Sequence, residues 1–138
     1  MTVRERSVFW GSALVAALAV GALVSFGAAQ KAQGGDKPAT AHLQAYIEAF
    51  NSGSLDRMKA FLEEHFAASA LKEAPVAQRV IRYQNGRLQL KSLTVDRVVA
   101  ELDFQTAVLV RTGGGQNVLL RAMVEKTAPH KLLAIMLE

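Results

Sequence analysis

The sequence contains no cysteine, which excludes disulfide bonds, thiolate metal sites, cysteine nucleophiles and a lipid-modified cysteine after an export leader. It also lacks any run of lysine and arginine interleaved with aromatic residues. Its 16 basic and 12 acidic side chains are spread along the chain and give a net charge of +4. Because nucleic-acid-binding domains gather basic residues on one face, nucleic acid is not an expected partner.

The length of the chain limits what it can be. Its 138 residues provide about one domain and are too few for enzyme folds that need well over roughly 200 residues. Hydrophobic residues make up 51% of the chain and charged residues 20%. These fractions are close to globular averages, so they exclude a disordered chain.

Charge is missing from Ser7 to Gln30, and most of that stretch is strongly apolar. Arg4 and Arg6 precede it, and small residues up to Ala29 end it. This order is typical of a secretory signal peptide over residues 1–29, cleaved after Ala29. The alternative is an uncleaved anchor, because the uncharged stretch is long enough to span a bilayer of about 30 Å. Both interpretations predict a secreted or periplasmic protein, which would contact the membrane only through an uncleaved leader.

The segment after the leader is polar. Residues 30–39, QKAQGGDKPA, contain a Gly-Gly pair and a proline, which predicts a flexible linker. A folded domain is expected over residues 40–138.

Apolar residues recur with helical spacing in the first half of this domain. The segments 40–51, 54–66 and 75–86 each place such residues on one face, which predicts three helices. Ser54 is a typical N-cap of the second helix, and Pro75 suits the first position of the third.

After Gly86 the apolar period changes to two, which predicts strands. Leu88 and Leu90 alternate with polar neighbours, and the alternation slips near Ser92, where we expect a bulge. Three more strands are expected at residues 104–112, 117–126 and 131–137, with the glycines 113–115 in a hairpin loop. The predicted fold is α+β, with three N-terminal helices packed on a curved antiparallel sheet of about four strands.

The last two predicted strands carry more apolar residues than one buried face requires. Helices can cover only one face of the sheet, so apolar residues on the other face would form an exposed patch, which is typical of an interaction site. A protein partner is expected there, most simply a second copy of the chain in a homodimer. The residues predicted to form this interface are Leu119, Met123, Leu132 and Met136.

The sequence also resembles a known family. Residues 49–56, AFNSGSLD, resemble the helix, short break and second helix of the nuclear transport factor 2-like superfamily, whose members are cone-shaped α+β domains. More narrowly, the chain is similar to a small secreted domain found beside β-lactamase-type serine hydrolases, and also alone. The matching segments are FAASAL (66–71), RVIRY (79–83), GRL (86–88) and PHKLLAI (129–135).

The resemblance implies a setting but no reaction and no cofactor. It implies a cone with a pocket for a small hydrophobic ligand, and an accessory role beside a secreted serine hydrolase. The aromatic residues expected to line the pocket are Tyr46, Phe50, Phe61 and Tyr83. The chain departs from the pattern in two places: residues 93–106 form a longer connection than usual, and Met136 stands where a polar residue is more common.

Three short motifs match the order used by penicillin-recognising serine enzymes. They are Ser69-x-x-Lys72, Tyr83-x-Asn85 and the incomplete Lys126-Thr127-Ala128. Those enzymes need a fold more than twice as long, and motifs of two or three fixed residues often arise by chance. We therefore assign no catalytic residue.

An alternative hypothesis is a small cone-fold enzyme that performs acid–base chemistry on a hydrophobic small molecule. The candidate groups are Tyr46, His65, Tyr83, Glu101 and Asp103. An acid or histidine pointing inward beside either tyrosine would favour the enzyme, whereas an apolar pocket would favour a binding domain. The three histidines have no metal-ligand spacing, so no metal site is expected.

Overall fold

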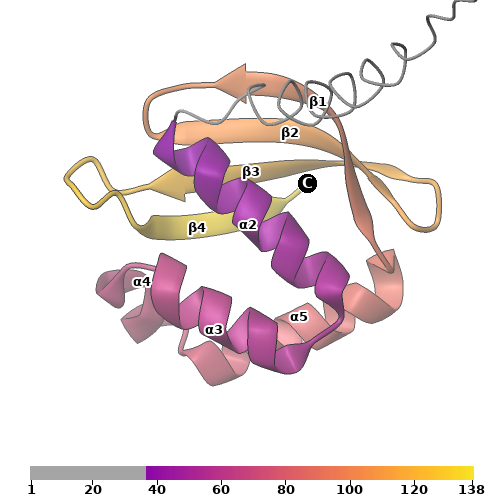
Figure 1. The fold of residues 1–138 in the computed structure, drawn as a ribbon, viewed down its shortest axis with the longest axis horizontal. Helices are drawn as coiled ribbons and strands as arrows, with labels where there is room; N and C mark the ends of the chain where they lie inside the picture. Colours follow the sequence, from indigo (N-terminus) through magenta and orange to yellow (C-terminus); the bar gives the residue numbers. More distant parts are fainter. Residues whose placement is uncertain (1–36) are drawn as a thin grey trace, which may run out of the picture. The chain divides into compact units, whose positions relative to one another are not determined.

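The computed structural model describes residues 37–138, which form helices followed by strands (Figure 1). The predicted leader and most of the predicted linker lie outside these residues. The described elements are α2 (Pro38–Ser52), α3 (Leu55–His65), α4 (Ala68–Glu73), α5 (Val76–Leu90), β1 (Leu93–Glu101), β2 (Gln105–Thr112), β3 (Asn117–Val124) and β4 (Leu132–Leu137). The predicted α+β class is confirmed. The described part has four helices where three were predicted.

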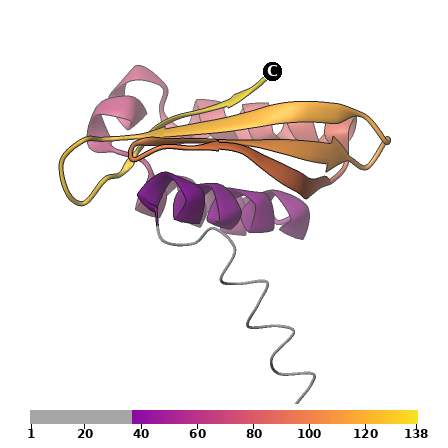
Figure 2. The same cartoon turned by 90° about the horizontal axis from the view of Figure 1, so that it is seen from above.

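The strands form one curved antiparallel sheet of four strands, as the sequence predicts, and their order is β1-β2-β3-β4 (Figure 1). Helix α2 lies across one face of this sheet (Figure 2). The other three helices lie along its β4 side (Figure 1).

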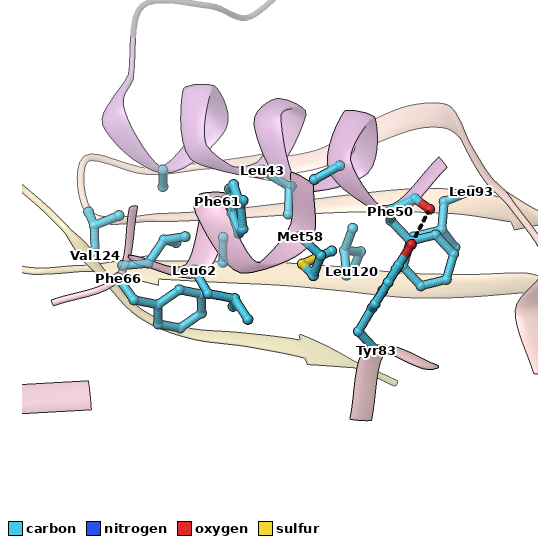
Figure 3. Close-up of a cluster of buried hydrophobic side chains, with 14 of the residues drawn as sticks. Leu43, Phe50, Met58, Phe61, Leu62, Phe66, Tyr83, Leu93, Leu120 and Val124 are labelled. Carbon is cyan, nitrogen blue, oxygen red and sulfur yellow. Dashed lines mark hydrogen bonds between the residues drawn. The ribbon is translucent and has the colours of Figure 1, made fainter. Parts of the chain in front are cut away.

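The core fills the space between α2, α3 and the sheet (Figure 3). Leu43 and Phe50 of α2 and Met58 of α3 are almost completely buried against strand residues such as Leu120. Burying each of these large side chains contributes about 1.5–3 kcal/mol. The helical stripes read from the sequence therefore face the core.

Local signals explain where the first two helices meet. Gly53 ends α2 with a left-handed φ of 69°, a conformation that costs a residue with a Cβ atom more than it costs glycine. The Ser54 side chain then accepts a hydrogen bond from the Arg57 backbone N–H at 3.2 Å and caps α3. The predicted cap is confirmed.

Asn51 ties the end of α2 to the start of the sheet. Its side-chain amide donates to the Leu93 carbonyl, and its oxygen accepts from the Leu93 N–H, both at 2.8 Å. One side chain thus satisfies both the N–H and the C=O of Leu93, the first residue of β1. Because β1 is an edge strand of the sheet, no second strand pairs with these two groups.

The third predicted helix is longer than expected. Helix α5 passes through Gly86 and ends at Leu90, so Leu88 and Leu90 lie on a helix and the predicted strand there is wrong. Gly86 faces the Phe50 ring, and an added Cβ would lie 3.6 Å from that ring, so the helix runs close to the core. Leu88 is 80% exposed, so its alternation with polar neighbours did not reflect a buried strand face.

The long connection expected over residues 93–106 is mostly strand β1. Two register shifts, between Val95 and Arg97 and between Val98 and Ala100, interrupt its alternation. Because each extra residue reverses which face the next side chain takes, the period of two is lost from the sequence.

A similar shift overturns the expectation for Leu132. This residue is 0% exposed and pairs with Val124 on the core side, whereas it was predicted on the outer face. Met123 pairs with Ala134, so Leu133 is an extra residue in β4 and is 39% exposed. The predicted outer residues Leu119 and Met136 are half-buried, and Met123 is 37% exposed.

We expect Asn51→Ala to lower the free energy of unfolding by about 2 kcal/mol, because it leaves two backbone groups of Leu93 without partners. Asn85→Ala is the matched control, since Asn85 is exposed on α5 and should change stability by less than about 0.5 kcal/mol. Urea denaturation of both variants measures the difference. Equal stability of the two variants would contradict this role for Asn51.

Candidate functional site

A cavity of about 210 Å³ lies between α2, α3, α5 and β4, and we call it the central cavity. Aliphatic side chains from α3 and β4 form one part of its wall, including Met58, Leu62, Ile135 and Leu137. Aromatic side chains form another part. The cavity therefore has a mainly apolar wall, as small-molecule sites commonly do.

Three of the four residues predicted to line a pocket line this cavity. They are Tyr46 and Phe50 from α2 and Tyr83 from α5. Phe61 does not. It is buried beside Tyr46, with ring centroids 5.8 Å apart, and it stacks on His65 at 4.5 Å. Met58 and Leu62 take the cavity-facing side of α3 instead, because they are four residues apart on one helical face.

The two tyrosine hydroxyls differ in their partners. The Tyr83 hydroxyl donates to the Phe50 carbonyl at 3.4 Å, a long hydrogen bond (Figure 3). The Tyr46 hydroxyl has no hydrogen-bond partner among residues 37–138. Burial, together with the neighbouring Tyr83, raises the pKa of Tyr46 to about 12. Tyr46 thus places a neutral hydroxyl at the cavity, available to a bound molecule.

Two arginines on α5 also line the cavity, and sequence reasoning did not identify them. Arg79 donates from Nε to the Ala74 carbonyl at 2.7 Å and from Nη2 to the Ala70 carbonyl at 2.8 Å. Its guanidinium lies 4.3 Å from the centre of the Phe66 ring. Burial, and then the nearby charge of Arg82, lower the pKa of Arg79. The two arginines therefore face the cavity as neighbouring positive charges.

The spacing of these arginines along the sequence could have identified them as residues of one helical face. Arg79, Arg82, Tyr83 and Gly86 stand at i, i+3, i+4 and i+7 on one face of α5. The predicted stripe of that helix contains only its apolar residues, whereas this face combines charge with an aromatic ring.

The described residues that line the cavity include no Asp, Glu or His. Of the acid–base candidates, only the tyrosines reach it. Glu101 accepts a hydrogen bond from Thr40 at 2.5 Å and is half-buried. Exposed Asp103 forms an ion pair with Lys37 at 2.7 Å, and this hydrogen-bonded cation lowers the pKa of Asp103. Neither carboxylate sits beside a cavity tyrosine.

His65 belongs to a histidine pair away from the central cavity. Its Nδ1 lies 2.8 Å from Nδ1 of His42, and Nε2 of His42 lies 2.9 Å from the His130 carbonyl. A carbonyl only accepts, so His42 Nε2 carries a proton, and in a neutral pair His65 Nδ1 donates to His42. Burial is the main cause of the lowered pKa of each ring, and the charge of Lys131 adds to it.

The serine-enzyme motifs are not brought together. Ser69 and Lys72 lie exposed on α4, and Lys126 lies exposed in the loop before β4. Tyr83 lines the central cavity, whose wall includes none of these three residues. The arrangement supports no nucleophilic serine.

Residues 37–138 contain no group of three or more metal-ligating side chains that could hold an ion. Within the same part of the chain, no helix has the length and apolar character needed to cross a membrane.

No protein-family model, curated protein or solved structure matches the chain. Its own geometry defines the class: an α+β domain with a mainly apolar cavity between its helices and an antiparallel sheet, lined by two arginines and by a tyrosine whose hydroxyl has no partner among residues 37–138.

The histidine pair predicts a dependence of stability on pH. The pKa of each ring is lowered from the ordinary value of 6.5, so the unfolded chain takes up protons first as the pH falls. The contribution of the pair to stability is complete above about pH 6.5 and declines below it, toward the lowered folded pKa values. We expect His65→Gln to show a shallower decline between about pH 7.5 and about pH 5.5 than the unchanged protein.

Urea denaturation midpoints at the two pH values measure this decline. Lys59→Gln is the control, because it changes an exposed side chain on α3 and leaves the His42–His65 pair and its contact with the His130 carbonyl intact. The same slope in His65→Gln and in the unchanged protein would contradict the assignment.

Proposed function

We propose that this is an exported, non-catalytic ligand-binding or accessory domain that holds a small hydrophobic molecule in the central cavity. The observation that carries the proposal is the cavity wall: apart from two arginines it is aromatic and aliphatic, and among residues 37–138 it includes no acid or histidine beside Tyr46 or Tyr83. Acid–base catalysis needs a group that titrates near the working pH. Tyr46, with a pKa of about 12, does not meet that need.

The size of the cavity supports a small ligand. An engineered apolar cavity of about 150 Å³ in another protein binds benzene, and typical drug-sized sites begin near 300 Å³. The central cavity, at about 210 Å³, lies between these values. A short alkyl chain or a single substituted ring suits this volume.

The wider setting is part of the same proposal. Helices that precede a curved antiparallel sheet, with a cavity between the two layers, support the resemblance to nuclear transport factor 2-like domains. Export rests on the apolar leader that ends at Ala29. An accessory role beside a secreted serine hydrolase rests on the resemblance alone.

We expect Leu137→Trp to weaken binding of the uncharged single-ring probe toluene, measured by calorimetry, at least about tenfold, a loss of about 1.4 kcal/mol. Leu137 lines the cavity and is also partly exposed, so a larger ring there narrows the entrance without opening the core. Val98→Trp is the matched control, since this valine is exposed to a similar extent on β1 and does not line the central cavity. Probe titration of the three proteins tests the proposal. No binding by the unchanged protein, or equal loss in both variants, would contradict it.

We also propose that a second copy of the chain covers part of the outer face of the sheet. Leu102, Phe104, Met123 and Leu133 line a shallow groove there, and all four are at least 37% exposed. This outer-face groove contains Met123, one of the residues predicted for the interface. Exposed apolar side chains that gather in one place mark interaction sites.

Self-association should therefore depend on Met123. We expect Met123→Lys to shift the protein from dimer to monomer in sedimentation equilibrium, because the dimer would bury a charge. Leu88→Lys, on exposed α5, should leave the dimer intact. A monomer at high micromolar concentration without any substitution would rule out this interface.

A further inference from the structure

We propose that the ligand of the central cavity is an amphipathic anion, with an alkyl or aryl tail against the aromatic wall and a carboxylate or phosphate head at Arg79 and Arg82. The inference rests on the proposed function, because it names the class of molecule for the same cavity.

Among residues 37–138, the charged side chains that line the cavity are all positive. Both arginines line it, and no acidic side chain does. The ion pairs among residues 37–138 are Lys37–Asp103 and Arg121–Glu138, so neither cavity arginine has a carboxylate partner. Helix α5 itself contains no acidic residue. The charge of Glu73 acts on Arg79, but it forms no ion pair with it, so a bound anion would meet two arginines without an ion-pair partner in the described residues.

Arg79 is fixed in place before any ligand arrives. Two backbone carbonyls, of Ala70 and Ala74, hold Nη2 and Nε, and the Phe66 ring lies under the guanidinium plane. Nη1 makes no hydrogen bond within the described residues. A planar guanidinium matches the oxygens of a carboxylate or phosphate, and one that is already ordered loses little entropy on binding.

Tyr46 supplies a further donor. Its hydroxyl stays protonated at neutral pH, since its pKa is about 12, and it has no partner among the described residues. An oxygen of a bound head group would accept a hydrogen bond from this half-buried hydroxyl in place of solvent. A purely apolar ligand would leave both this hydroxyl and the arginine unmatched.

The test compares ligands that differ only at the head. Native protein, purified without detergent, is titrated by calorimetry with octanoate, octyl phosphate and octanol. Acetate and inorganic phosphate are titrated as well, because they carry the same head groups without an alkyl tail. We expect both octyl anions to bind about tenfold or more tightly than octanol, the range of charge-assisted hydrogen bonds. Acetate and inorganic phosphate should show no measurable binding at the same concentrations.

Arg82 is the residue to change, because its side chain is exposed and its loss should not disturb the core. Arg82→Gln should remove most of the preference for octanoate over octanol, and Arg82→Lys should keep part of it. Arg111→Gln, which removes an exposed arginine on β2 that does not line the cavity, is the matched control and should change nothing.

The outcomes separate the two proposals. Equal affinity for octanol and octanoate, an unchanged preference in Arg82→Gln, or inorganic phosphate binding as tightly as octyl phosphate would overturn the anion inference. The proposed function would survive each of these results. If no octyl compound and no neutral probe binds, the proposed function fails as well.

Discussion

Helix α2 is held at both of its ends by hydrogen bonds that cross to the sheet. At its start the Thr40 hydroxyl lies 2.8 Å from the Thr106 hydroxyl and donates to Glu101, which joins the helix to β2 and to the end of β1. At its end Asn51 holds both backbone groups of Leu93 at the start of β1. With its ends fixed, the middle of α2 presents Tyr46 and Phe50 to α3 and α5. The central cavity depends on that constraint, because these two side chains form one of its walls.

The opposite wall is a helix that combines structural and polar roles. Gly86 lets α5 lie close to Phe50, while Arg79 uses two of its donors to hold the end of α4. The guanidinium is held by two hydrogen bonds, is flanked by the Phe66 ring and belongs to a residue that lines the central cavity. Hydrophobic volume and a preorganised cation are together the two features needed to bind a molecule that has both a tail and a charged head.

Much of the fold followed from residue patterns, and the failures have physical causes. Helical stripes placed Tyr46, Phe50 and Tyr83 in the core, and the period of two over residues 104–137 predicted β2, β3 and β4. The end of α5 was misplaced because Leu88 is exposed although its local alternation is typical of a strand. Bulges hid the length of β1 and turned Leu132 inward, since each extra residue reverses the face of those after it. Arg79 and Arg82 were missed because the candidates were sought among apolar residues and among groups suited to acid–base chemistry, which do not include arginine.

Methyl NMR of the native protein titrated with octanoate tests the central claim most directly. The account predicts that the largest shift changes occur at Leu62 and Ile135, which line the central cavity from α3 and β4. The methyl groups of Leu119 and Leu133, on the outer face of the sheet, should remain unchanged. Shift changes confined to the outer face, or none at any site at millimolar octanoate, would contradict it.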